Sequence, residues 1–133
     1  MVIGDPDLTA RTLKATRRIA DAALQGACCD GSMVYERHAD GSYDNEKHWW
    51  VQAESVVGQL YLWRFHGREE MLGSALRTWD YIRRFIVDSE GGEWLWSRLP
   101  DGSPNRHDDK AGFWKCPYHN SRMCIEAVER LRD

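Results

Sequence analysis

The sequence predicts an all-α protein of about four helices that carry two short β-hairpins. Apolar residues recur at helical spacing in four segments, and two Asp-Gly dipeptides follow short runs of alternating aromatic residues. The order helix, hairpin, helix also occurs twice along the chain, which indicates an internal repeat. A length of 133 residues fits a single domain of ordinary size.

Composition and charge exclude several classes of protein. A net charge of −3 gives no reason to expect nucleic acid or an anionic membrane as a partner. No apolar run approaches the length of a membrane span, and residues 1–14 lack the apolar core of a secretory signal. The four cysteines include no Cys-x-x-Cys pair, so neither a disulfide framework nor a zinc ribbon is indicated. We therefore expect a cytoplasmic protein with reduced thiols.

The first helix is expected to end at about Gln25. Asp7 or Thr9 can cap its start, and Gly26 is a suitable stop. Its apolar stripe has near-helical spacing and comprises Leu8, Thr12, Ile19, Ala20, Ala23 and Leu24.

A short hairpin is expected next, over residues 32–44, followed by a second helix over residues 48–67 with Asp44 or Asn45 as its cap. This second helix is apolar on nearly every side. Its only formal charge between Trp49 and Leu62 is a single glutamate. A helix of this composition is normally buried in the centre of a domain.

The second half of the chain repeats the arrangement. A third helix is expected over residues 68–87 and a second hairpin over residues 91–105. The fourth helix should begin at Cys116-Pro117, with proline at the favoured first helical position, and run to about Arg132.

The two halves also match residue by residue. Residues 34–42 and 95–103 share hydrophobic-aromatic-x-Arg-x-x-Asp-Gly-Ser, 61 positions apart, and Trp50 aligns with Trp114. Such units bury their apolar faces by stacking on one another. Because the second and third helices are joined by a tight turn, all the long loops fall at the other end of the stack. We expect the functional site there.

Two titratable residues stand at that end. Glu54 is a carboxylate on the buried helix, which is costly unless it is paired or hydrogen-bonded. It either satisfies a group in the core or lines a cavity. His119 lies in the first turn of the fourth helix, where the helix dipole disfavours the imidazolium ion. A neutral imidazole there can accept a proton, although a histidine that only caps or packs fits the same pattern.

Flat aromatic rings are concentrated around these positions. They are Trp49, Trp50, Trp94, Trp96 and Trp114. Such rings either pack the repeats together or, beside polar groups, stack on sugar rings. Cys116 and His119 are too few for a metal site, so we expect no metal.

Three stretches resemble the N-acylglucosamine 2-epimerase superfamily, and most nearly its cellobiose 2-epimerase branch. They are KHWWVQAESVVG (47–58), GEWLWSRLPDGS (92–103) and WKCPYHNSRMCIE (114–126). The resemblance implies an (α/α)6 barrel, an α/α toroid, of which residues 1–133 would form the C-terminal portion. It also implies epimerisation at C2 of a reducing-end sugar, by proton removal and return through an enediolate, without metal or cofactor.

The resemblance assigns roles to five residues. His119 matches the family's C-terminal catalytic histidine and Glu54 a site carboxylate. Trp49 and Trp50 match the aromatic pair that stacks on the sugar, and Trp114 would stand near them. The family's second catalytic histidine, in a His-x-x-Glu motif, and a polarising arginine belong to earlier parts of the barrel. We therefore expect residues 1–133 to be inactive alone.

Two other functions stay open. The first is an aldose–ketose isomerase built on the same barrel, and the second is a non-catalytic sugar-binding or interaction fragment. In each case the partner is a small sugar or disaccharide, with neither nucleic acid nor membrane involved. An open barrel would leave apolar faces along the first and fourth helices, so we expect the isolated chain either to self-associate through them or to be poorly stable. Side chains expected on these faces are Leu13, Ile19, Met123 and Val128.

Overall fold

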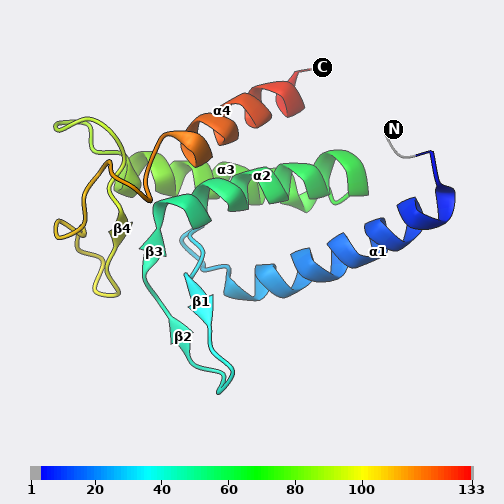
Figure 1. The fold of residues 1–133 in the computed structure, drawn as a ribbon, viewed down its shortest axis with the longest axis horizontal. Helices are drawn as coiled ribbons and strands as arrows, with labels where there is room; N and C mark the ends of the chain where they lie inside the picture. The colour runs from blue at the N-terminus through cyan, green and yellow to red at the C-terminus, as the bar shows by residue number, and fades with distance from the viewer. Residues whose placement is uncertain (1–3, 133) are drawn as a thin grey trace.

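The computed structural model describes residues 4–132, and its architecture is helical, as expected (Figure 1). Three helices lie together while the first diverges from them. The helices are α1 (Pro6–Ala23), α2 (Trp49–His66), α3 (Glu70–Tyr81) and α4 (Tyr118–Leu131). A 3-10 turn (Leu24–Gly26) follows α1 and a π-helical turn (Ile82–Ile86) follows α3. The predicted order of helices is confirmed.

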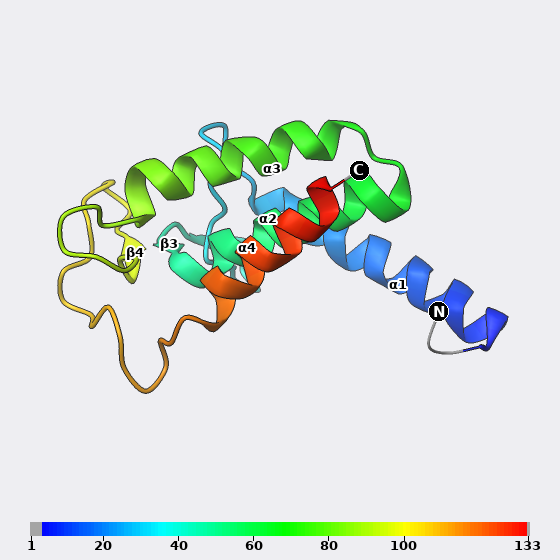
Figure 2. The ribbon, with the colours of Figure 1, turned by 90° about the horizontal axis from the view of Figure 1, so that it is seen from above.

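Helix α2 is the centre of the fold. It packs against both α3 and α4, and the three helices run alongside one another in two views (Figures 1 and 2). Its buried side chains include the polar Gln52, whose amide exchanges two hydrogen bonds of 2.8 Å with the backbone of Met33. The prediction that this helix is buried is confirmed, because its apolar surface is divided between two neighbours.

The predicted cap of α1 is wrong by a few residues. Asp5 is the N-cap, and its Oδ1 accepts hydrogen bonds from the amides of Asp7 and Leu8 at 2.9 and 3.0 Å. Asp7 and Thr9 therefore lie inside the helix. An aspartate followed by proline at the first helical position is a favourable start, because proline lacks the amide hydrogen that would otherwise need a partner.

The predicted caps of α2 are also wrong. Strand β3 (Lys47–His48) leads directly into the helix, so the N-cap is His48, not Asp44 or Asn45. The amide of Trp49 donates to the carbonyl oxygen of Trp96 at 3.0 Å. The first helical amide is thus satisfied by the residue that precedes β4 in the second repeat, rather than by a local side chain.

Both hairpins form, and a further strand pair joins them. Strand β1 (Glu36–Arg37) pairs with β2 (Tyr43–Asp44), which confirms the first hairpin. In the second, β4 (Ser97–Arg98) forms one antiparallel bridge, between Arg98 and Pro104. Strand β4 also pairs with β3, a contact between the repeats that the sequence analysis did not include. This pair ties the two repeats together at the loop-bearing end.

The internal repeat is visible in its turns. Within 40–42 and 101–103, the aspartate Oδ1 accepts from the serine amide at 2.9 Å and from its hydroxyl at 2.7 Å. The central glycines have φ of 89° and 84°, which favours glycine. A third Asp-Gly-Ser turn, residues 30–32, has the same contacts and a glycine φ of 90°. The sequence analysis missed this third copy.

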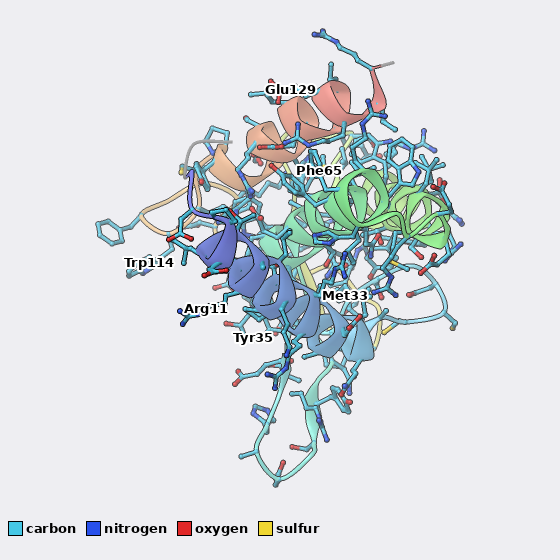
Figure 3. The ribbon with its side chains drawn as sticks, turned by 90° about the vertical axis from the view of Figure 1, so that its right-hand side faces the viewer. Arg11, Met33, Tyr35, Phe65, Trp114 and Glu129 are labelled. Atoms are coloured by element: carbon cyan, nitrogen blue, oxygen red, sulfur yellow. The ribbon has the colours of Figure 1, made fainter. Side chains whose placement is uncertain are left out.

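Helix α1 packs little against the other three, and it has no buried residue. Its side-chain contacts with the α2–α3 end are polar: Arg17 donates to His66 at 2.9 Å, and Asp21 pairs with Arg68 at 2.7 Å. Viewed end-on in Figure 3, α1 stands apart from α4. Ile19 is 69% exposed, as expected for an open face.

On the opposite side, α3 and α4 border an apolar groove of about 460 Å³. Val128 lines it and is 49% exposed, as predicted, and Leu13 on α1 is also exposed. The prediction for Met123 is wrong. Its side chain is 2% exposed, because it lies on the side of α4 that faces the α2 core.

We expect residues 1–133, purified alone, to self-associate or to unfold at low temperature, because two apolar faces stay open to water. Sedimentation velocity and calorimetry measure both properties. Replacing Ile19 and Val128 by lysine should shift the chain toward monomer, whereas lysine at Asn45, an exposed polar position in the loop after β2, should not. A wild-type monomer with a sharp transition well above room temperature would contradict this expectation.

Candidate active site

The loop-bearing end of α2 and α4 brings together the two titratable residues singled out in the sequence. Glu54 lies in the second turn of α2, and His119 is the second residue of α4. Pro117 occupies the N-cap, one position before its predicted place. His119 Nδ1 lies 2.7 Å from Glu54 Oε1, with both side chains about one third exposed. The predicted location of His119 in the first helical turn is confirmed.

Arg122 completes this cluster, and the sequence analysis missed it. It follows His119 by three positions on α4, so both side chains lie on the same helical face. Its Nη1 contacts Glu54 Oε2, while His119 occupies Oε1. Burial raises the pKa of Glu54, but hydrogen bonds and charge from Arg122 and His119 outweigh it and leave the pKa lowered. Glu54 is therefore an ionised carboxylate at neutral pH.

The ionised carboxylate determines the form of the histidine. A carboxylate can only accept hydrogen bonds, so the hydrogen of the Glu54–His119 contact must reside on Nδ1. In a neutral imidazole the lone pair is then on Nε2. Within residues 4–132, no side chain or backbone group forms a hydrogen bond with Nε2. The site thus presents an oriented, unoccupied proton acceptor.

Two tryptophan rings border His119, but their environments differ. The Trp49 ring lies 5.4 Å from the imidazole, nearly perpendicular, and the Trp50 ring 5.8 Å away, tilted by 39°. Trp50 is 36% exposed, so its ring is accessible to a ligand. Trp49 is 2% exposed and belongs to the hydrophobic core. In this structure Trp49 supports His119 from behind and has no open face, contrary to the predicted stacking pair.

Lys115 fixes the segment that leads into α4. Its side chain is 1% exposed, and Nζ donates to the carbonyl oxygens of Trp94 and Lys110 at 2.6 Å each. Nζ also lies 4.9 Å from the centre of the Trp49 ring. Burial lowers the pKa of Lys115, and the charge and hydrogen bond of Glu93 partly offset this lowering. No sequence pattern distinguished this lysine from a solvent-exposed one.

The side chain of Trp114 does not lie beside His119. Its side chain is 82% exposed and packs edge-on against the ring of Phe113, which is 91% exposed. Figure 3 shows it pointing away from the helices. In this bent loop Lys115 takes the buried position, and Phe113 and Trp114 before it face the solvent. The prediction that Trp114 stands near the other site residues is therefore wrong for this structure.

The aromatic surface extends instead toward the first hairpin. The Tyr35 ring lies 6.1 Å from Trp50 and stacks on His48 at 4.0 Å. Trp96 continues this row at 6.3 Å from His48, whereas Trp94 is buried in the core. A groove of about 360 Å³ beside α2 is lined by residues that include Tyr35, Trp50 and Glu54.

Other candidate groups lie elsewhere. Residues 66–69 fit a His-x-x-Glu pattern, but they span the turn between α2 and α3, at the end opposite His119. Cys116 is exposed and unpaired. Across residues 4–132, no three His, Cys, Asp or Glu side chains are placed to hold a metal ion, and no helix is long and apolar enough to cross a membrane.

Comparison with known proteins matches this chain to sugar epimerases. Residues 5–122 match the model of the family described as N-acylglucosamine 2-epimerase. The cellobiose 2-epimerase of Bacteroides fragilis is 50% identical over 128 residues, which cover 96% of this chain and 33% of that protein. The cellobiose 2-epimerase of Ruminococcus albus is 40% identical over 134 residues, 97% of this chain and 33% of the relative. The chain therefore spans about a third of the length of these curated relatives.

Solved structures give the same result. A sugar epimerase from a ruminal bacterium superimposes with a TM-score of 0.88 at 36% identity, over 98% of this chain and 33% of that one. A D-mannose isomerase structure has a TM-score of 0.73 at 25% identity, covering 84% and 29% of the two chains. These likenesses confirm the predicted fold class, an all-α fold of the α/α-toroid type.

Proposed function

Because the chain belongs to the N-acylglucosamine 2-epimerase family, we propose that it supplies part of the active site of a carbohydrate 2-epimerase. The substrate is a small reducing sugar or disaccharide, and the reaction inverts C2 through an enediolate. One observation carries the proposal: His119 is held by Glu54 with its second ring nitrogen open, beside the accessible ring of Trp50.

The chemistry assigns one half of the reaction to these residues. Once the sugar ring has opened, the hydrogen at C2 lies beside a carbonyl group and is weakly acidic. Nε2 of His119 accepts this proton as general base while the apolar face of the sugar stacks on Trp50. Inversion then needs an acid on the opposite face and a donor for the enediolate oxygen. Both come from groups outside this cluster, and no metal or cofactor takes part.

A second candidate is an aldose–ketose isomerase, favoured by the likeness to D-mannose isomerase. The curated D-mannose isomerase of Marinomonas mediterranea is 28% identical over 103 residues, 76% of this chain and 26% of that protein. An isomerase forms the same enediolate but returns the proton to C1. The product therefore separates the two: a C2 epimer supports the first proposal and a ketose the second.

The test is a chimera in which this chain replaces the matching third of the Bacteroides fragilis relative, with which it shares 50% identity. The chimera is incubated with cellobiose or mannose in D₂O, and the products are followed by NMR. We expect deuterium at C2 and a C2 epimer. Residues 1–133 alone should give neither. Tryptophan fluorescence that responds to sugar, without turnover in the chimera, would overturn the catalytic proposal in favour of a sugar-binding fragment.

Replacing Glu54 by glutamine in the chimera is expected to lower kcat about 10–100-fold, because the base loses the partner that orients it. The same change in the chimera should also alter how the free energy of unfolding depends on pH. The pKa of Glu54 is lower in the folded state than its ordinary 4.5, so its ionised form stabilises the fold fully above that pH. This contribution is lost as pH falls through the folded pKa.

Unfolding of wild type and Glu54→Gln is therefore compared from pH 3 to 7. The difference between them should narrow below about pH 4.5, the ordinary pKa of the group. Glu36→Gln, in the exposed β1 strand, is the control for the loss of a surface carboxylate. Unchanged activity of the Glu54 variant would mean that the carboxylate only satisfies the core.

A further inference from the structure

We infer that Arg122 is a positioning residue that fixes Glu54 and thereby the tautomer of His119, keeping Nε2 as the proton-accepting nitrogen. The catalytic consequence of this inference rests on the proposed function. The structural part, which nitrogen of His119 carries the hydrogen, stands on the contacts among the three side chains.

The first step of the argument is the geometry of the carboxylate. One oxygen of Glu54 accepts from His119 Nδ1 at 2.7 Å, and the other is held by Nη1 of Arg122. The two partners come from adjacent positions on one face of α4, whereas Glu54 comes from α2. With both oxygens engaged by one helix, the carboxylate cannot rotate without breaking a charged hydrogen bond.

The second step concerns the charge of Glu54. Burial has the largest single effect on the pKa of Glu54 and raises it, which disfavours the ionised form. Arg122 and His119 lower this pKa, and Arg122 has the larger effect of the two. Arginine stays protonated at every accessible pH, whereas the charge of histidine is what changes during proton transfer. Arg122 therefore supports the ionised form of Glu54 in both protonation states of His119.

The third step follows from hydrogen-bond complementarity. An ionised Glu54 accepts a hydrogen from Nδ1 and leaves the lone pair on Nε2. A protonated Glu54, or one rotated away from the ring, would let the imidazole place its hydrogen on Nε2. The histidine would then have no lone pair facing the substrate. Arg122 thus sets the direction of proton transfer without touching the sugar.

The chain provides a matched control for this role. Arg130 lies on the same helix and also faces α2, where its Nη2 donates to the hydroxyl of Tyr61 at 2.6 Å; the same nitrogen pairs with Glu126 of α4 itself at 2.8 Å. Its guanidinium lies 4.5 Å from the centre of the Tyr61 ring. Arg130 therefore also joins α4 to α2, but within residues 4–132 its hydrogen-bond and ion-pair partners are Tyr61, Glu126 and Glu129, not Glu54 or His119. Replacing Arg130 therefore shows how much activity is lost when an arginine between α2 and α4 is removed without disturbing Glu54 or His119.

The test observes directly which ring nitrogen of His119 carries the hydrogen. The chimera labelled with ¹⁵N-histidine is examined by NMR at neutral to mildly alkaline pH, where imidazole nitrogen shifts identify the tautomer. The Glu54 carboxyl is followed from pH 3 to 7 in a sample labelled with ¹³C-glutamate. Wild type should show hydrogen on Nδ1 of His119. Arg122→Gln should move most of the population to hydrogen on Nε2 and bring the Glu54 carboxyl titration to higher pH. Arg122→Lys keeps the charge and should show an intermediate result, and Arg130→Gln should match wild type.

Kinetics in the chimera supply the second readout. Arg122→Gln is expected to reduce kcat about 10–100-fold with little change in KM, and Arg130→Gln to leave both near wild type. An Arg122→Gln variant that keeps the wild-type tautomer and Glu54 titration overturns the inference, whatever its activity. If the tautomer shifts as expected but the wild-type chimera does not exchange C2 hydrogen, the positioning role stands and the proposed function fails.

Discussion

Replacing His119 by asparagine is expected to reduce exchange of the sugar C2 hydrogen with solvent deuterium by about 10²–10⁴-fold in the chimera. The asparagine amide keeps a donor for the ionised Glu54, and the ring of Trp50 stays in place for stacking. The variant has no basic nitrogen, however, so the C2 proton has no acceptor. Sugar binding should therefore survive while proton transfer is lost. NMR in D₂O measures the exchange, and tryptophan fluorescence measures the binding.

The control is His107→Asn, because His107 lies on an exposed loop and makes no contact with this cluster. It should exchange C2 hydrogen at the wild-type rate. A His119→Asn chimera that retains near wild-type exchange would remove the general-base role and return His119 to a capping or packing residue. Loss of both binding and exchange would show instead that the ring also holds the sugar.

Replacing Trp49 by alanine is expected to lower the free energy of unfolding by about 3–5 kcal/mol, the cost of removing a large buried ring. Trp49 is 2% exposed, contacts the core and lies beneath both His119 and the ammonium group of Lys115. A cavity there would also release the start of α4. Urea unfolding of the chimera, followed by circular dichroism, measures the effect.

Trp50→Ala is the matched comparison, since the two tryptophans are neighbours in the sequence. Trp50 is 36% exposed, so its loss should cost far less stability while weakening sugar binding. The two variants thus separate a core ring from a ligand-stacking ring. Equal destabilisation by both would contradict the division of roles inferred from their burial.

The arrangement of helices could be predicted because hydrophobic periodicity reports it directly. An unbroken apolar surface on the second helix meant that neighbours must cover it, and α3 and α4 do so. The meeting of Glu54 with His119 followed from the same reasoning, since two helices that both begin after long loops start at the same end. These predictions depended on spacing, which a sequence displays.

The features that could not be predicted depend on non-local geometry. Adjacent residues of a helix point about 100° apart, so only the placement of its neighbours decides that Trp49 is buried and Trp50 exposed. In the sequence, Arg122 cannot be distinguished from the other charged residues of an amphipathic helix. Strand β3 pairs with β4 across nearly fifty residues, and no local pattern encodes that pairing.

That pairing of β3 with β4 also determines how the site assembles. The amide of Trp49, the first residue of α2, is bonded to the carbonyl oxygen of Trp96. The helix that carries Glu54 therefore cannot fray from its start unless the two repeats separate. The segment that follows β4 leads through the buried Lys115 to His119. The carboxylate of Glu54 and the imidazole of His119 come from opposite halves of the chain but form one cooperative unit, so local opening of either half disassembles the whole site.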